Sequence, residues 1–191
     1  MSVAGLLLAA GSGSRFGSPK ALVSYRGQTL VERGVALLRD AGCDPVLVVV
    51  GAQAEQVTAV VGDDALTVTC PDWQRGMGAS LCTGLAALPA TSSAVVVALA
   101  DQPLVTAEAV TRLLAAGGQA AVATYGGKAR NPVLLSRSTW EQVAELAVGD
   151  VGARPWLSAH PELVTEVPCD DAGSPFDIDT PADLAALEAP A

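Results

Sequence analysis

The residues best suited to chemistry lie in one glycine-rich stretch, Leu8–Lys20, which reads LAAGSGSRFGSPK. Small residues such as Gly11 and Gly13 let the backbone approach a ligand closely, and the N–H groups of such a turn can bind an anion. Arg15 and Lys20 add the positive charge that a triphosphate needs. The alternative is a flexible surface turn that carries two solvated cations. The stretch lacks the GxxxxGK(S/T) pattern of a P-loop, and its third glycine comes one residue too late for a GxGxxG dinucleotide fingerprint.

Two aspartates are the best candidates for binding a divalent cation. Asp101 directly follows the apolar run Ala94–Ala100, so its carboxylate is expected at the carboxyl edge of a sheet. Asp179 belongs to an extended segment in which Asp177 points the same way. Mg²⁺ binds one or two carboxylates together with phosphate oxygens and waters, and this pair fits that preference. The alternatives are that Asp101 caps a turn and that the dipole of a following helix favours Asp179.

Short apolar runs alternate with helical patterns along the chain. The runs are nearly continuous, which is typical of strands covered on both faces of a parallel sheet. We predict strands at Val3–Ala10, Pro45–Val50, Leu66–Thr69, Ala94–Ala100 and Ala120–Tyr125. We predict helices at Leu30–Ala41, Ala54–Val61, Ala79–Leu88 and Ala107–Ala116. This alternation of strands and helices indicates βαβ units.

Local signals predict where helices begin and end. Three pairs have the spacing of a capping box and each predicts a helix start: Thr29 with Glu32, Ser138 with Glu141, and Thr180 with Asp183. Gly42 stands where the first helix should end. We therefore predict one α/β domain over residues 1–191, with a Rossmann-like, doubly wound, mostly parallel sheet and helices on both faces. Ligands of such sheets bind beyond the carboxyl ends of the strands, which directs attention to residues 11–20, 51–53, 71–80 and 101–103.

The composition excludes several classes of protein. Half of the 191 residues are hydrophobic, and 11 Lys and Arg stand against 20 Asp and Glu, for a net charge of −9. This acidic balance argues against a nucleic acid or an anionic membrane as partner, because both need a basic face. The four cysteines stand singly with no CxxC pair, which disfavours zinc and iron–sulfur sites. The apolar run near the N-terminus is too short for a signal or a membrane span, so we expect a soluble, cytoplasmic protein.

The glycine-rich stretch resembles the signature loop of nucleotidyltransferases, which join an NTP to a phosphorylated acceptor and release pyrophosphate. Within that superfamily, the chain is most similar to the molybdenum cofactor cytidylyltransferases. The similarity covers nearly the whole chain through the further motifs Trp73–Ser80 (WQRGMGAS), Ala100–Pro103 (ADQP), Asn131–Val133 (NPV), Gly149–Arg154 (GDVGAR) and Asp177–Leu184 (DIDTPADL). The resemblance implies Mg²⁺ as cofactor, held by Asp101 and Asp179.

Each remaining candidate residue has an expected role in such a reaction. We expect Lys20 to neutralise the α- or β-phosphate and Arg15 to hold the β- and γ-phosphates, so that these two residues and Asp101 carry catalysis. The residues expected to contact the nucleotide are Leu8, Ala9, Ala10, Gly11, Arg15, Lys20, Gly51, Asp72, Ser80 and Asp101. Backbone groups near Ala10 and Gly51 should read the base. By resemblance, the residues that face the acceptor are Arg130, Asn131 and Arg154.

The resulting hypothesis is transfer of a cytidylyl group from CTP to a molybdopterin-type cofactor, with release of pyrophosphate. A molybdenum hydroxylase apoenzyme would be the recipient of the product. Ala10 favours CTP, because guanylyl-transferring relatives tend to have a second glycine there. The alternatives are a guanylyltransferase or a sugar-phosphate nucleotidyltransferase of the same superfamily, and a non-catalytic carrier of the molybdenum cofactor. Arg15, Lys20 and Asp101 argue against the carrier, which would not need them.

Overall fold

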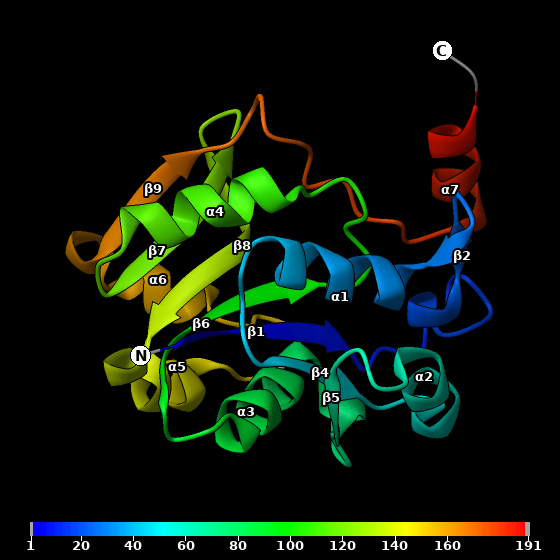
Figure 1. Ribbon diagram of the computed structural model, residues 1–191, viewed down its shortest axis with the longest axis horizontal. Coiled ribbons are helices and arrows are strands. Elements are labelled where there is room, and N and C mark those ends of the chain that lie inside the picture. Colours follow the sequence, from blue (N-terminus) through cyan, green and yellow to red (C-terminus); the bar gives the residue numbers. More distant parts are fainter. Residues whose placement is uncertain (1, 190–191) are drawn as a thin grey trace.

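A seven-stranded sheet with strand order β5-β4-β1-β6-β8-β7-β9 runs through the centre of the protein (Figure 1). The structure, a computed structural model, describes residues 2–189. The sheet strands are β1 (Ser2–Ala9), β4 (Val46–Val50), β5 (Leu66–Thr69), β6 (Ser92–Leu99), β7 (Ala120–Tyr125), β8 (Lys128–Ser136) and β9 (Val164–Pro168). Of these seven strands, only β8 runs antiparallel to its neighbours, β6 and β7. The predicted α/β class with a mostly parallel sheet is therefore confirmed.

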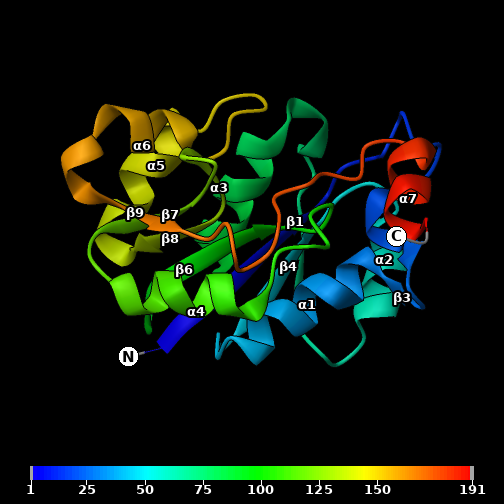
Figure 2. The same cartoon turned by 90° about the horizontal axis from the view of Figure 1, so that it is seen from above.

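Helices cover both faces of the sheet (Figures 1 and 2). Three helices pack on one face: α1 (Leu30–Asp40), α2 (Ala54–Val61) and α4 (Ala107–Ala116). Three pack on the other: α3 (Met77–Ala87), α5 (Trp140–Leu146) and α6 (Arg154–Ala159). The last helix, α7 (Pro181–Glu188), lies beside a small hairpin of β2 (Ser24–Tyr25) and β3 (Gln28–Thr29). Of the helices that the structure describes, none has the length and apolar character needed to cross a membrane.

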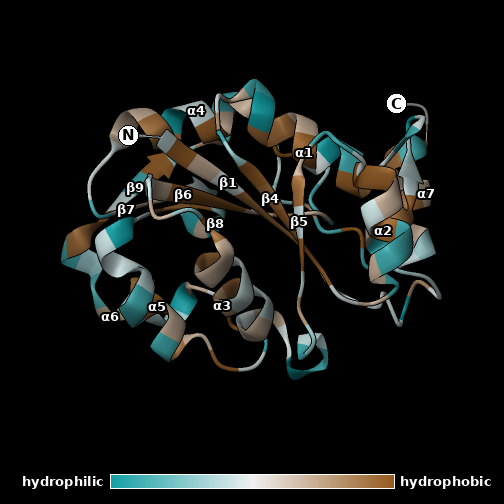
Figure 3. Cartoon of the chain, turned by 60° about the horizontal axis from the view of Figure 1, so that its bottom comes forward, coloured by the Kyte–Doolittle hydropathy of each residue, from teal (hydrophilic) through white to brown (hydrophobic). Residues whose placement is uncertain are grey.

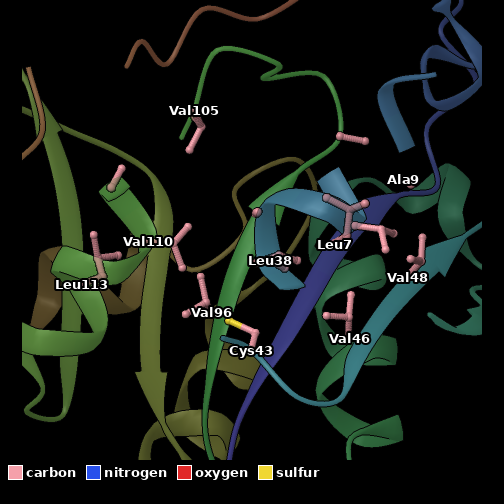
Figure 4. Packing of buried hydrophobic residues seen from close by; sticks show 14 of the residues in the cluster. Leu7, Ala9, Leu38, Cys43, Val46, Val48, Val96, Val105, Val110 and Leu113 are labelled. Atoms are coloured by element: carbon pink, nitrogen blue, oxygen red, sulfur yellow. The ribbon is translucent and has the colours of Figure 1, made fainter. Parts of the chain in front are cut away.

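Alternation along β1 divides the core into two layers. Leu7 and Ala9 face α1 and α4, whereas Leu6 and Leu8 face α3. Figure 4 shows Leu7 and Ala9 among buried side chains of the first layer, and Figure 3 shows the apolar strands between the two helix layers. Each leucine that folding buries completely contributes about 1.5–3 kcal/mol. A strand buried on both faces is thereby held in place, and it fixes the point at which the loop after it begins.

Helix α1 begins and packs as its sequence predicts. The capping box of Thr29 and Glu32 is present, with Thr29 N–H donating to Glu32 Oε2 at 2.7 Å and Glu32 N–H to Thr29 Oγ1 at 3.3 Å. Gly34 lets the helix approach the sheet closely, since a Cβ there would lie 2.6 Å from Leu7 Cδ1. The capping box predicted for Thr180 and Asp183 is likewise present at the start of α7.

Several local expectations were wrong or incomplete. Ser138 caps no helix, because its Oγ pairs with Ser136 Oγ and a 3₁₀ turn (Arg137–Thr139) intervenes before α5 begins at Trp140. Helix α3 begins two residues earlier than predicted, at Met77. Strands β8 and β9 and helix α6 were not predicted from the sequence. The pair Gly126-Gly127, at φ of 57° and 68°, is a hairpin signal that could have revealed β8.

Candidate active site

The loop after β1 is shaped by a glycine that no other residue could replace without strain. Gly13 has φ of 59°, and a Cβ there would lie 2.1 Å from the carbonyl oxygen of Ser18. The carbonyl of Gly13 accepts hydrogen bonds from the N–H groups of Phe16 (2.8 Å) and Gly17 (2.9 Å). This tight turn returns the chain toward the sheet and delivers Lys20 to the carboxyl edge of β1 and β6.

Asp101 reaches the same edge from the neighbouring strand. The chain moves outward from β1 to β4 and β5 and then returns to place β6 on the other side of β1. The carboxyl ends of β1 and β6 thus flank the point where the strand order reverses, which is where sheets of this kind bind ligands. Ala100 N–H donates to Leu8 O at 3.1 Å, which fixes the end of β6 against the end of β1.

The ammonium group of Lys20 joins two carboxylates. Its Nζ donates to Asp101 Oδ2 and, at 2.8 Å, to Asp179 Oδ1. Burial by itself lowers the pKa of Lys20, but the charges and hydrogen bonds of Asp101 and Asp179 outweigh it, so the pKa lies above its ordinary value. The three charged groups come from chain positions 20, 101 and 179 and meet only in the folded protein.

Asp179 is anchored from both sides of its position in the chain. The preceding Ile178 is fully buried with Val23, Tyr25 and Leu30 in a small third core. On the other side, Asp179 N–H donates to Asp183 Oδ2 at 3.1 Å, within the capping box of α7. Side chains alternate along this extended segment, so burying Ile178 turns Asp179 toward Lys20.

A cavity of about 520 Å³ lies over the ends of β1 and β6. Ser80, a predicted nucleotide contact, lines it on the side of α3. Six further predicted nucleotide contacts line it on the side of β1 and β6: Leu8, Ala9, Ala10, Gly11, Lys20 and Asp101. Trp73 and Met77 complete the α3 side. Its volume suits a bound small molecule such as a nucleotide.

Three predicted nucleotide contacts do not line this cavity. Gly51 supports it from below, since a Cβ there would lie 2.7 Å from Ala10 O and from Trp73 Cβ. The carboxylate of Asp72 lies 3.6 Å from Arg75 Nη1 on an exposed turn. Arg15 is 77% exposed, and its Nη1 lies 4.0 Å from Asp179 Oδ2. Gly51 is thus packed beneath the lining and Asp72 is paired in solvent, and contact of these residues with a nucleotide stays a prediction.

A second cavity, of about 800 Å³, opens beside the first. Arg130, Asn131 and Arg154, the predicted acceptor residues, all line it. The two cavities share five lining residues: Lys20, Met77, Leu99, Asp101 and Asp150. The Lys20–Asp101 pair is therefore accessible from both cavities.

Asp150 lies at the junction of the two cavities, although the sequence did not predict it as a nucleotide contact. Its Oδ1 accepts a hydrogen bond from Met77 N–H at 3.3 Å, at the N-terminus of α3. The loop and helix approach so closely that a Cβ on Gly78 would lie 2.1 Å from Ala147 O. Gly76, at φ of 104°, also admits no side chain, since its Cβ would lie 2.5 Å from Asp150 Oδ1. The closely spaced glycines on either side of Met77, together with Gly149, were the available signal for this contact.

The carboxylates of Asp101 and Asp179 suit a divalent cation. Both already converge on one cation, the Lys20 ammonium, so a metal ion could be bound between them without a change of fold. Within residues 2–189, no group of three or more His, Cys, Asp or Glu is arranged to hold a metal. Two carboxylates are what Mg²⁺ takes from a protein when phosphate oxygens and waters supply the rest of its ligands.

Comparison with known proteins places these features in a family. Residues 5–164 match the family model of the MobA-like NTP transferase domain. Nicotine blue oxidoreductase from Paenarthrobacter nicotinovorans is 37% identical over 189 residues, which cover 93% of this chain and 92% of that protein. A bifunctional IPC transferase and DIPP synthase from Rubrobacter xylanophilus is 33% identical, with 95% of this chain and 50% of that protein covered.

Solved structures agree with the sequence comparisons. Rv0371c from Mycobacterium tuberculosis superposes with a TM-score of 0.86 at 29% identity, over 98% of this chain and 97% of that one. A structure of Rv0371c in complex with manganese gives a TM-score of 0.83, at 29% identity and 98% coverage of both chains. The resemblance predicted from the motifs is confirmed. The chain belongs to the family of MobA-like NTP transferase domains and is a nucleotidyltransferase of that family.

Proposed function

We propose that this protein transfers a cytidylyl group from CTP to a molybdopterin-type cofactor and releases pyrophosphate, with Mg²⁺ as cofactor. The observation that carries the proposal is the Lys20–Asp101–Asp179 cluster at the junction of two cavities. One cavity has the size for a nucleotide and the other for a flat acceptor, and the charged cluster lies where the two substrates would meet. A molybdenum hydroxylase apoenzyme is the proposed recipient of the product.

The chemistry needs alignment and charge neutralisation more than a base. An ionised phosphate oxygen of the acceptor attacks the α-phosphorus in line, a new P–O bond forms, and the bond to the departing pyrophosphate breaks. The nucleophile is already an anion, so no side chain has to remove a proton. Lys20 would exchange its carboxylate partners for phosphate oxygens and stabilise the charge that develops there. Bound Mg²⁺, held by Asp101 and Asp179, would neutralise phosphate charge.

The remaining roles follow from position. Leu8, Ala9 and Ala10 would present backbone groups to the base at the end of β1, and the methyl group of Ala10 favours the smaller pyrimidine. Arg15, extended and exposed beside Asp179, could fold over the β- and γ-phosphates. In the second cavity, the cations of Arg130 and Arg154 suit a phosphorylated acceptor, and Asn131 offers hydrogen bonds.

Pyrophosphate release measured with each NTP and each acceptor tests the proposal. We expect release only with Mg²⁺, with CTP preferred, and with a molybdopterin-type acceptor but not a sugar phosphate. Turnover with GTP alone would instead indicate a guanylyltransferase, and turnover with a sugar phosphate would indicate a sugar-phosphate nucleotidyltransferase. If both Lys20→Ala and Asp101→Asn supported maturation of a molybdenum hydroxylase as well as wild type, the carrier hypothesis would replace it.

A second candidate function comes from one comparison. The relative that aligns over 92% of its own length is named as an oxidoreductase, which raises hydride transfer from a nicotinamide cofactor in the same cleft. The residues favour nucleotidyl transfer, because β4 is followed by Gly51 and no acidic residue stands there for a ribose hydroxyl. Oxidation of NADH or NADPH with flat aromatic acceptors, assayed beside pyrophosphate release, separates the two activities.

A further inference from the structure

The cation site depends on how one extended segment is held against the end of β6. Residues 173–179 lie antiparallel to the turn 101–105, with a bridge between Val105 and Gly173. Ser174 N–H donates to Leu104 O at 3.1 Å, and Ile178 N–H donates to Asp101 O at 2.9 Å. This pairing brings the carboxylate of Asp179 next to that of Asp101.

Gln102 lies at the centre of this pairing and contributes its side-chain amide to it. Its Nε2 donates to Asp177 Oδ1 at 2.8 Å and to Pro175 O at 3.4 Å. Gln102 is only 6% exposed, and its Oε1 finds no hydrogen-bond partner among the residues that the structure describes. A buried amide oxygen without a partner costs free energy, so packing does not explain a glutamine here. The amide donor does.

The amide group of Gln102 bonds to one of three neighbouring carboxylates, that of Asp177. Asp101, Asp177 and Asp179 all line the second cavity, and all three carry oxygen ligands of the kind that Mg²⁺ prefers. Gln102 holds Asp177, whereas Asp101 and Asp179 converge on Lys20. The amide of Gln102 is therefore placed to keep the Asp177 carboxylate apart from the two that face the Lys20 ammonium.

We propose that Gln102 is a positioning residue for the cation site. Its amide fixes Asp177, sets the register of residues 173–179 so that Asp179 faces Asp101, and keeps Asp177 out of the ligand set. This inference rests on the proposed function for the use of the cation. In other proteins, loss of a group that holds a metal ligand in place changes metal affinity or activity by roughly 10- to 100-fold, and Gln102 would hold Asp179 in place through residues 173–179.

Mn²⁺ binding to the full chain with CTP present, measured by electron paramagnetic resonance, tests the inference. Gln102→Glu sets a second carboxylate against that of Asp177, and the repulsion between the two should displace residues 173–179 and carry Asp179 away from Asp101. Loss of this ligand should outweigh the added negative charge, so Mn²⁺ should bind roughly 10- to 100-fold more weakly. Asp177→Asn should bind Mn²⁺ as wild type does, because the amide oxygen of the substituted side chain can still accept the hydrogen bond. Gln119→Glu adds the same charge at an exposed position and is the matched control.

The double variant Gln102→Glu with Asp177→Asn gives the sharpest result. The amide of Asp177→Asn can donate to the carboxylate of Gln102→Glu, so Mn²⁺ binding should recover most of the loss. Exchange of the Ile178 amide hydrogen, which Gln102→Glu alone should speed up by loosening the bond to Asp101 O, should slow again. Weak Mn²⁺ binding by Asp177→Asn alone would overturn the inference, because Asp177 would then be a ligand. A folded double variant without recovery would also overturn it, and so would wild-type binding by Gln102→Glu.

The same experiment separates this inference from the proposed function. Wild type that releases pyrophosphate from CTP while Gln102→Glu binds Mn²⁺ normally would contradict the role of Gln102 and leave the function standing. Wild type that releases no pyrophosphate from any NTP, with the expected Mn²⁺ series, would contradict the function and leave the role of Gln102 standing. Wild type that binds no Mn²⁺ would contradict both. If Gln102→Glu lowers the melting temperature too far for Mn²⁺ binding to be measured, Mn²⁺ binding by Asp177→Asn and by the double variant decides the inference.

Discussion

Lys20 occupies the position at which a metal ion would contact Asp101 and Asp179. In the structure its ammonium neutralises both carboxylates, and its pKa lies above the ordinary value of a lysine, so the charge persists through neutral and mildly alkaline pH. In the proposed function, Asp101 and Asp179 would hold the metal ion while the Lys20 ammonium would pair with phosphate oxygens, so metal and triphosphate together would compensate for the loss of the present pairing. Entry of the metal without nucleotide has no such compensation.

Lys20→Ala should therefore strengthen the binding of a free metal ion and slow the release of pyrophosphate. Pyrophosphate release should fall by roughly 100- to 1,000-fold, the usual loss on removing one group that stabilises developing charge. Binding of free Mn²⁺ without nucleotide should become tighter, because the competing ammonium is gone. Lys128→Ala, which removes an exposed lysine of β8, is the control and should change neither quantity. Weaker Mn²⁺ binding by Lys20→Ala would contradict the competition between ammonium and metal.

Among the elements, the turn between β1 and the 3₁₀ turn at Lys20–Leu22 shows how two glycines differ in role. Gly13 is required by its φ and by the Ser18 carbonyl that crowds it. Gly11 has an ordinary φ and open space where a side chain would lie, yet it lines the nucleotide cavity. Gly13 is therefore required by the fold, and the proposed role of Gly11 is to leave room for the ligand.

The same substitution at these two positions should separate stability from binding. Gly13→Ala should lower the free energy of unfolding by about 1–3 kcal/mol through strain and crowding. Gly11→Ala should leave stability within about 0.5 kcal/mol, as surface changes usually do, but weaken CTP binding. Urea denaturation and CTP titration of both variants measure this. Equal destabilisation by the two substitutions would contradict the distinction.

The capping box at the start of α1 predicts a pH dependence of stability. Hydrogen bonds from the Thr29 side chain and backbone lower the pKa of Glu32 below its ordinary value. A lowered carboxyl pKa contributes stability above the unfolded value of 4.5 and loses it as the pH falls through the folded value. Wild type should therefore lose more stability in that acidic window than Glu32→Gln. Parallel slopes in acid denaturation would rule out this contribution.

Local signals in the sequence were sufficient for most elements. Continuous apolar runs such as Val46–Val50 and the box of Thr29 and Glu32 identify strands and a helix start with no knowledge of the rest of the chain. Strand β8 was missed because its first half, Lys128–Asn131, is polar and only its second half is buried. The Ser138 prediction was wrong because a hydroxyl can bond to a neighbouring side chain instead of a helix N–H.

Contacts between distant residues were predicted less completely. Asp101 and Lys20 could be assigned to one edge, because the ends of parallel strands meet there. The sequence could not show that Lys20 bridges Asp101 and Asp179, or that Gln102 holds Asp177, since these contacts depend on side-chain geometry across 75 to 159 positions of the chain. The nucleotide contact of Asp72 stays a prediction, and its carboxylate lies 3.6 Å from Arg75 Nη1 on an exposed turn.

On the scale of the whole molecule, the proposed cation site would be completed by phosphate oxygens of the bound nucleotide, which predicts coupled binding of nucleotide and cation. Nucleotide and cation should each stabilise the fold, and together they should do so by more than the sum of their separate effects. A ligand at 100 times its Kd adds about 2.7 kcal/mol to the free energy of unfolding. Thermal melts with Mg²⁺, CTP and both should show the largest rise in Tm for the pair. Equal shifts by CTP with and without Mg²⁺ would contradict the metal assignment.

A crystal structure of the protein with CTP and Mg²⁺ tests the central claim most directly. We predict the triphosphate on the turn of residues 11–20, the metal ion between the carboxylates of Asp101 and Asp179, and Lys20 Nζ moved from those carboxylates to a phosphate oxygen. A triphosphate bound elsewhere, or a metal ion that touches neither Asp101 nor Asp179, would contradict it.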